Sequence, residues 1–295
     1  MTAVDRAPRT KRVGIMVVVA FMVACLAACG SDDDSSTGKD SAGEKTLTVG
    51  VQLSYAPYEY VEGGEVTGFE VDLVEEVLGR LGYKTEWKNI PFDTIFTAVS
   101  AGKIDMAAST INGWAPEGSL VYDVVKQRTE IVSLSRPIYL VKYLVVSNKT
   151  KNPDLKSTDQ LVDGMTVAVV QGSSEYEYAQ KELAPRGVRV VTVPSGAQAF
   201  TLVESGRADA TFAEAGAIAA AAEQQTNLQP GEPISSLEAG YAWAFPLDDP
   251  EFVDDVNATI GEVIEDGTYA KIFEKYFPGA TAPTDLPTAS FSAGS

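Results

Sequence analysis

The chain contains no histidine among its 295 residues. Histidine is the commonest general base and the commonest metal ligand, so its absence removes the usual residue for both roles. Only two cysteines are present, Cys25 and Cys29. Cys25 lies in a segment that we expect to be cleaved, so the mature chain would keep one cysteine and no disulfide. We predict neither a metal nor a cofactor.

Positive charge is also scarce. Lysine and arginine together number 23, against 41 aspartate and glutamate residues, which gives a net charge of −18. Four of these cations and one of the acids lie in residues 1–28, so removal of that segment leaves 19 against 40 and a net charge near −21. A surface of this sign repels phosphate backbones, which argues against a nucleic-acid partner.

The amino terminus resembles a processed leader. The apolar run from Val13 to Leu26 is too short and too interrupted to predict a membrane-spanning helix. It follows a basic stretch, so residues 1–28 are expected to be a secretory signal peptide. The segment LAAC, ending at Cys29, is similar to the lipobox of bacterial lipoproteins, which implies cleavage before Cys29 and a lipid anchor on its sulfur. An ordinary signal peptide with an incidental cysteine is the alternative. Residues 29–45 are polar and predict a disordered tether.

A central stretch from Phe92 to Arg128 indicates how the rest of the chain is organised. It predicts a helix over 92–101, a glycine stop, and a buried strand over 104–108 that ends in small polar residues. Such groups lie at the carboxyl edge of a sheet, where open α/β sheets bind ligands. The helix–glycine–cation–strand pattern AVSAGKIDMA recurs as LVESGRADAT. This repeat predicts two similar lobes that face one site.

Strands and helices alternate along the chain, which favours mostly parallel α/β units. We predict a first lobe from residues 46–138 plus 242–278, a second lobe from residues 143–237, and a disordered tail at 279–295. Two extended segments, 137–146 and 239–246, cross between the lobes. A chain that crosses twice forms a two-strand hinge, and this topology permits the two lobes to close on each other.

Seven segments, taken in order, carry a resemblance to a known family. They are LTVGVQLSYAPYEY, GFEVDLVEEV, PFDTIFTAVSAGKIDMA, RTEIVSLSRPIY, VAVVQGSSEYEYA, SGRADATFAE and DGTYAKIFEKYF. Over roughly residues 47–277 they resemble family 3, the amino-acid type, of bacterial extracellular solute-binding proteins. The resemblance implies a two-lobed periplasmic-binding-protein-like α/β fold whose lobes close around a ligand. It also implies a receptor for an ABC importer, with permease subunits as partners.

The resemblance places Arg128 where the family has an arginine that clamps the ligand's carboxylate. The planar fork of arginine suits bidentate carboxylate binding, with each charged hydrogen bond contributing about 1.5–3 kcal/mol. A solvated surface arginine is the alternative, because the connection 113–127 that precedes it is longer than usual.

Two further groups are expected to meet the charged ends of an amino acid. Gly172, Ser173 and Ser174 match the family's Gly-Thr-Thr, and backbone N–H groups at a helix start bind anions. A simple helix cap would also explain both serines. Glu214 stands where the family usually has an aspartate that pairs with the ammonium. The alternative for Glu214 is an exposed carboxylate at a helix start.

The uncharged part of the predicted site comes from the first lobe. Tyr55 and Phe92 match aromatic positions that sandwich the ligand's side chain, although aromatic residues near a turn are also common in cores. Ser109, Thr110 and Asn112 continue the strand and are expected to provide hydrogen bonds to the ligand.

Two positions depart from the family pattern or stay open. Gln52 stands where many members have aspartate, which weakens the case for a ligand with a cationic side chain. Trp114 lies in the long connection 113–127, and it either caps the pocket or packs on the surface.

Three functions are compatible with these residues. The first is a lipid-anchored substrate-binding subunit for uptake of an amino acid or related small zwitterion, extracellular and non-enzymatic. The second is a sensing module that presents its closed form to a membrane receptor. The third is a secreted dehydratase on the same fold, which would need a positioned acid or base with a shifted pKa. Glu214 is the only obvious pocket carboxylate for that role.

Overall fold

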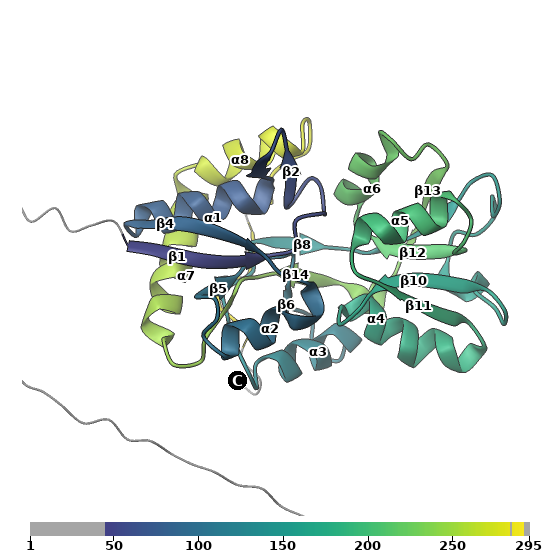
Figure 1. Ribbon diagram of the computed structural model, residues 1–295, viewed down its shortest axis with the longest axis horizontal. Coiled ribbons are helices and arrows are strands. Elements are labelled where there is room, and N and C mark those ends of the chain that lie inside the picture. The colour runs from purple at the N-terminus through teal and green to yellow at the C-terminus, as the bar shows by residue number, and fades with distance from the viewer. Residues whose placement is uncertain (1–44, 284, 292–295) are drawn as a thin grey trace, which may run out of the picture. The chain divides into compact units, whose positions relative to one another are not determined.

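A computed structural model describes residues 45–283 and 285–291 of the chain (Figure 1). These described residues form one compact unit. The expected signal peptide, Cys29, nearly all of the expected tether and residues 292–295 lie outside the described residues. Within the described part of the chain, no helix has the length and apolar character needed to cross a membrane.

The first of two five-stranded sheets has the strand order β4-β1-β5-β15-β7. Its centre is parallel, because β1 pairs in the same direction with β4 and with β5, whereas β15 runs antiparallel to β5 and β7. The strands are β1 (Lys45–Val51), β4 (Tyr83–Asn89), β5 (Met106–Ala107), β7 (Ser133–Leu134) and β15 (Ala244–Phe245). Helices α1 (Phe69–Arg80) and α2 (Phe92–Ser100) connect its parallel strands, and a hairpin of β2 (Tyr60–Glu62) and β3 (Glu65–Thr67) precedes α1.

The second five-stranded sheet has the order β11-β10-β12-β9-β13. Strands β10, β11 and β12 are parallel, and β9 joins antiparallel to β12 and β13. The strands are β9 (Leu144–Asn148), β10 (Thr166–Val170), β11 (Arg189–Val193), β12 (Ala210–Ala213) and β13 (Leu228–Pro233). The helices of this part are α4 (Ser174–Tyr178), continued by a π-helical turn (Ala179–Leu183), then α5 (Gly196–Glu204) and α6 (Ala215–Ala222). The chain therefore forms two sheets, each with parallel strands connected by helices, and this agrees with the two similar α/β lobes that the sequence predicts.

Two helices illustrate why the chain folds as it does. In α1, Phe69, Leu73 and Val77 recur at helical spacing and are fully buried, and the chain turns at Gly82 with a left-handed φ of 83°. In α7 (Pro250–Glu265), the Asp249 carboxylate accepts a hydrogen bond from the Phe252 N–H at 3.2 Å. In both helices the local sequence therefore accounts for the helix: apolar residues at helical spacing in α1, and a capping aspartate before a proline at the start of α7.

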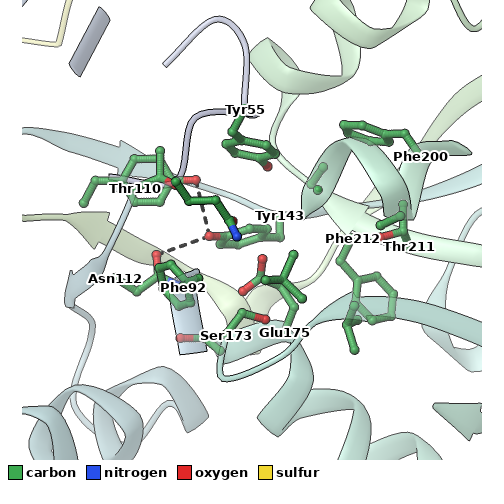
Figure 2. A pocket seen from close by; sticks show the side chains of 18 of the residues that line it. Tyr55, Phe92, Thr110, Asn112, Tyr143, Ser173, Glu175, Phe200, Thr211 and Phe212 are labelled. Atoms are coloured by element: carbon green, nitrogen blue, oxygen red, sulfur yellow. Dashed lines mark hydrogen bonds between the residues drawn. The ribbon is translucent and has the colours of Figure 1, made fainter. Parts of the chain in front are cut away.

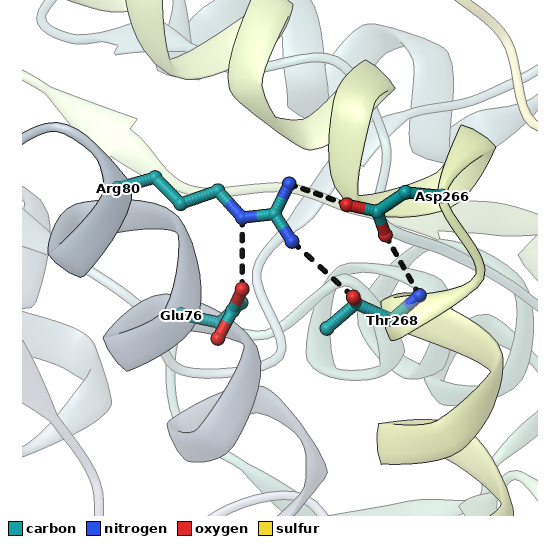
Figure 3. Close-up of polar contacts among 4 residues, drawn as sticks. All are labelled: Glu76, Arg80, Asp266 and Thr268. Carbon is teal, nitrogen blue, oxygen red and sulfur yellow. Dashed lines mark hydrogen bonds and ion pairs between the residues drawn. The ribbon is translucent and has the colours of Figure 1, made fainter.

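Polar contacts join α1 to the carboxyl-terminal helices α7 and α8 (Thr268–Tyr276) (Figure 3). Arg80 pairs with Glu76 on its own helix at 2.8 Å and with Asp266 at 2.7 Å, and it donates to the Thr268 hydroxyl at 3.2 Å. These contacts, with hydrogen bonds from Arg80 as the main cause, lower the pKa of the Asp266 carboxyl to about 2. The contacts join the end of α1 to the junction between α7 and α8.

The two linking segments lie side by side. Strand β8 (Tyr139–Val141) pairs antiparallel with β14 (Ala239–Tyr241), and β6 (Asn112–Trp114) pairs with the other edge of β14. Both crossings of the chain therefore run through one small three-stranded sheet (Figure 1).

The long connection before Arg128 contains a helix that the sequence analysis did not identify. Ser119 caps α3 (Leu120–Arg128), and Val121, Val125 and Arg128 form its buried stripe. The helix contacts β6, and it also contacts α4 of the second sheet. The insertion therefore positions Arg128 at the end of a packed helix.

Part of the segment predicted as a disordered tail makes specific contacts. Leu286 is 4% exposed, Ser290 accepts a hydrogen bond from the Asn257 amide at 2.9 Å, and the Phe291 ring lies 4.9 Å from that of Tyr122. These contacts place residues 286–291 against α7 and α3.

Candidate ligand-binding site

A cavity lies between the carboxyl ends of strands from both sheets (Figure 2). Its lining includes residues from β10, β12, α4 and α5 of the second sheet and from the turns that follow β1 and β5 of the first. The lining residues are Gln52, Tyr55, Glu59, Phe92, Thr110, Asn112, Arg128, Tyr143, Val169, Val170, Ser173, Ser174, Glu175, Gly196, Ala199, Phe200, Thr211, Phe212, Ala213 and Tyr241.

Arg128 is a buried cation that opens on this cavity. Only 6% of it is exposed, and its guanidinium donates to the backbone oxygens of Asn112 at 2.7 Å and Gly172 at 3.2 Å. The guanidinium carbon lies 4.9 Å from the ring centre of Phe96 and 5.8 Å from that of Phe92. Among the described residues it forms no ion pair. Burial lowers the pKa of the guanidinium to about 10, so the group still holds its charge at neutral pH.

Glu214 does not itself line the cavity, but it borders the cavity from the second sheet through its contact with the lining residue Tyr55. It is the first residue after β12 and precedes α6 without a capping hydrogen bond from its side chain, and it is 3% exposed rather than a surface carboxylate. One carboxylate oxygen accepts a hydrogen bond from the Tyr55 hydroxyl at 2.8 Å, and the other is buried without a partner. Burial raises the pKa of the Glu214 carboxyl to about 7, and the hydrogen bond from Tyr55 opposes this rise.

The glycine–serine turn lies between β10 and α4. Gly172 has a left-handed φ of 78°, and a Cβ there would lie 3.4 Å from the Asp93 Cα of α2, so glycine suits both the turn and the close approach of the two parts of the chain. The Ser173 side chain accepts a hydrogen bond from the Tyr176 N–H at 3.1 Å, so Ser173 acts as a helix cap. A cap does not explain Ser174, whose buried hydroxyl has no partner.

The other predicted residues fall close together. Tyr55, Phe92, Thr110 and Asn112 all line the cavity. Thr110 has a left-handed φ of 45°, a conformation that residues other than glycine rarely adopt and that is common at ligand sites. Ser109 does not line the cavity, because its hydroxyl is buried and accepts from the Gln52 N–H at 3.0 Å.

Several lining residues were missed by sequence reasoning. Glu175 follows the two serines, is half-buried, and reaches into the cavity from α4 (Figure 2). Burial raises the pKa of its carboxyl to about 7, the charge of Glu214 adds to the rise, and Arg128 opposes it. Tyr143 and Tyr241 come from the linking segments, and the Tyr143 hydroxyl donates to the Asn112 side chain at 3.2 Å. Exposed and buried positions alternate from Leu140 to Tyr143, and this pattern could have identified Tyr143, whereas residues 239–241 are all buried and show no alternation.

Trp114 does not line the cavity. It lies in β6, where it pairs with Gly240 of β14, and it is half-buried.

A pair of buried carboxyls lies at the cavity wall, where Glu59 lines the cavity and Glu70 lies next to Glu59. Glu59 and Glu70 are each 1% exposed, and each accepts a hydrogen bond from Thr110. The Thr110 hydroxyl donates to Glu59 at 3.0 Å, and its N–H donates to Glu70 at 2.7 Å. Burial raises the pKa of both carboxyls, that of Glu70 to about 7, and the charge of Glu70 raises the pKa of Glu59 further. Two neighbouring buried carboxyls of this kind favour holding one proton between them.

Across residues 45–283 and 285–291, no cluster of three or more histidine, cysteine, aspartate or glutamate side chains is arranged to hold a metal ion. What the cavity offers chemically is one cation, nearby carboxylates and a ring of aromatic faces.

Comparison with known proteins agrees with this architecture. Residues 47–279 match the family described as bacterial extracellular solute-binding proteins, family 3. The chain is 30% identical over 269 residues to the arginine-binding extracellular protein ArtP of Bacillus subtilis (strain 168), covering 90% of this chain and 97% of that protein.

Solved structures give the same result. An ancestral arginine-binding protein bound to arginine superimposes with a TM-score of 0.70 and 28% identity, over 79% of this chain and 98% of the other. The ancestral amino acid-binding protein AncCDT-1, a precursor of cyclohexadienyl dehydratase, gives a TM-score of 0.69 and 28% identity, over 79% and 95% of the two chains. These neighbours confirm the predicted two-lobed α/β fold.

Proposed function

Because the chain belongs to family 3 of the bacterial extracellular solute-binding proteins, we propose that it is the lipid-anchored substrate-binding subunit of an ABC importer. In this proposal it holds an amino acid or a related small zwitterion between two lobes, 46–138 plus 242–278 and 143–237, and delivers it to a membrane permease. The observation that carries the proposal is the buried Arg128, whose charge faces a cavity and forms no ion pair with any described residue. A buried cation without a counter-ion is costly, and a ligand's carboxylate would supply that counter-ion.

The surrounding groups suit the remaining parts of an amino acid. The ligand's carboxylate would bind Arg128 together with the unpartnered hydroxyl of Ser174, and its ammonium would bind the free carboxylate oxygen of Glu214. The side chain would lie between the rings of Tyr55 and Phe92, with Thr110 and Asn112 providing hydrogen bonds. A micromolar dissociation constant requires about −8.2 kcal/mol, which two charged contacts with aromatic packing are sufficient to supply.

Contacts between the two lobes support a ligand-driven closure. The Tyr55 hydroxyl reaches Glu214, Arg128 donates to the Gly172 oxygen, and the Gln52 amide donates to the Pro194 oxygen. Each of these pairs joins a residue of the first lobe to one of the second. A ligand that touches both lobes binds the closed arrangement better than an open one, so its binding favours closure.

A dehydratase is the second candidate, and one observation favours it. Glu175 and Glu214 both have a carboxyl pKa near 7, which suits proton transfer at neutral pH. The solved ancestor of a dehydratase is itself described as an amino acid-binding protein. Incubation with prephenate or arogenate separates the two candidates, because an importer subunit leaves both compounds unchanged and a dehydratase consumes one of them. A permease gene beside this one would favour the importer over a sensing module.

The ammonium site gives the first prediction. Glu214→Gln is expected to weaken amino-acid binding roughly tenfold to a hundredfold, because the charged partner of the ammonium is lost while the shape of the side chain is kept. Binding by the unaltered protein is expected to strengthen as the pH rises from 6 to 8, since Glu214 must be ionised and its pKa is about 7. Titration calorimetry measures both effects. The exposed Glu223→Gln serves as the control, and equal affinities in the two variants would show that Glu214 does not hold the ammonium.

The anchor gives the second prediction. Cys29→Ser is expected to release the protein into the medium of cells that normally retain it, because a serine cannot carry the thioether-linked lipid. Fractionation of cells and medium with detection by antibody measures the release. Retention of the variant on membranes would contradict lipid attachment at Cys29.

A further inference from the structure

Negatively charged side chains outnumber positively charged ones around the cavity. Arg128 is the only cation among the described residues that line it, whereas Glu59 and Glu175 line it directly and Glu214 borders it. Glu70, which shares Thr110 with Glu59, adds no compensating positive charge. With its carboxylates ionised, the cavity carries an excess of negative charge.

A neutral zwitterion would leave this excess in place. Its carboxylate would pair with Arg128 and its ammonium with Glu214, and the charge of Glu175 would stay uncompensated in a cavity that closes around the ligand. A charge that is shut away from water without a partner is unfavourable, so it is either neutralised by a proton or balanced by a charge of opposite sign. A second positive group on the ligand supplies that charge.

Glu175 is placed to contact such a second positive group on the ligand. Its side chain reaches into the cavity from the first turn of α4, beside the Ser173 cap (Figure 2). Gln52, which lines the cavity from the first lobe, is neutral, and its amide donates to the Pro194 oxygen. Of these two lining residues, only Glu175 brings a negative charge to the cavity.

The aromatic lining is suited to the same class of ligand. Tyr143, Phe212 and Tyr241 line the cavity together with Tyr55 and Phe92. A guanidinium or ammonium group over such ring faces is attracted by their negative potential, most strongly where water is excluded.

We infer that the cavity selects amino acids with a basic side chain, and that the Glu175 carboxylate sets this preference. The inference rests on the proposed function, since it specifies the charge of a ligand that binds between Arg128 and Glu214. It assigns to Glu175 a role that the helix-cap interpretation of the Gly172–Ser174 turn does not require.

The test compares two ligands of the same shape that differ in charge. L-Arginine and L-citrulline have side chains of equal length, and citrulline ends in a neutral urea group. Titration calorimetry at pH 7.5 is expected to show the unaltered protein binding L-arginine roughly tenfold or more tighter than L-citrulline. Glu175→Gln is expected to bring this ratio close to one, mainly by weakening L-arginine, and exposed Glu182→Gln is expected to preserve it.

Three results would overturn the inference or its premise, and they are distinguishable. Equal affinity of the unaltered protein for the two ligands, or an unchanged ratio in a folded Glu175→Gln variant, would contradict charge selection while leaving amino-acid binding intact. Absence of binding to L-arginine, L-lysine, L-citrulline and L-glutamine by a cooperatively melting protein would contradict the proposed function itself. A thermal melt of each variant checks that it folds.

Discussion

Replacing Arg128 by alanine is expected to weaken ligand binding by roughly two orders of magnitude or more. The guanidinium would make two charged hydrogen bonds with the ligand's carboxylate, and each contributes about 1.5–3 kcal/mol. The free energy of unfolding is expected to change little, because the buried Arg128 forms no ion pair with a described residue and its desolvation already opposes folding. Calorimetry measures the loss of affinity, and urea unfolding measures the stability.

Two matched variants sharpen this result. Arg128→Lys keeps the charge but not the planar fork, so its affinity should lie between those of the unaltered protein and the alanine variant. Arg207→Ala removes an exposed arginine away from the cavity, and this variant should bind normally. An unaltered affinity in Arg128→Ala would show that the ligand's carboxylate binds elsewhere.

The unliganded protein is expected to be more stable at pH 5 than at pH 8. A carboxyl whose pKa rises on folding holds its proton more tightly in the native state than in the unfolded chain. Between the unfolded pKa and the folded pKa, the native state therefore binds more protons, and stability falls as the pH rises. For Glu70 and Glu214 this window runs from 4.5 to about 7. A single carboxyl shifted over this range costs roughly 3 kcal/mol above pH 7.

Urea unfolding at several pH values between 5 and 8 measures this dependence. Glu70→Gln is expected to make the pH dependence shallower, because a neutral amide still accepts the Thr110 N–H and the remaining Glu59 loses the repulsion of a second charge. Glu65→Gln, an exposed position of the β2–β3 hairpin, is the control and should leave the dependence unchanged. A stability that rises from pH 5 to pH 8 would contradict the raised pKa values of these buried carboxyls.

Local sequence patterns were sufficient to predict much of the fold. The α7 segment has a capping aspartate, a proline at its first position and apolar residues at helical spacing, so its bounds are readable without a structure. The echo between AVSAGKIDMA and LVESGRADAT anticipated two sheets with the same local plan. The resemblance to the family, rather than residue spacing, pointed to Arg128. The lobe boundaries and the roles of the site residues stay predictions.

Features set by tertiary packing were missed. Helix α3 follows a glycine and proline segment, and its buried stripe of Val121, Val125 and Arg128 contains a cation, so its apolar pattern is weak. Glu175 resembles an ordinary acid in the first turn of a helix, which is favourable on any exposed helix. Only the packing of α4 against the first lobe shows that this acid lies beside the Arg128 cavity.

The account depends on a charged small molecule held at once by Arg128 and Glu214, and a ligand-dependent melting experiment tests this most directly. A ligand at 100 times its dissociation constant adds about 2.7 kcal/mol of stability, or roughly 5–10 °C for a domain of this size. We predict such a rise with at least one amino acid, and its loss in both Arg128→Ala and Glu214→Gln. A flat melting temperature with every amino acid, or a rise that survives in both variants, would contradict the account.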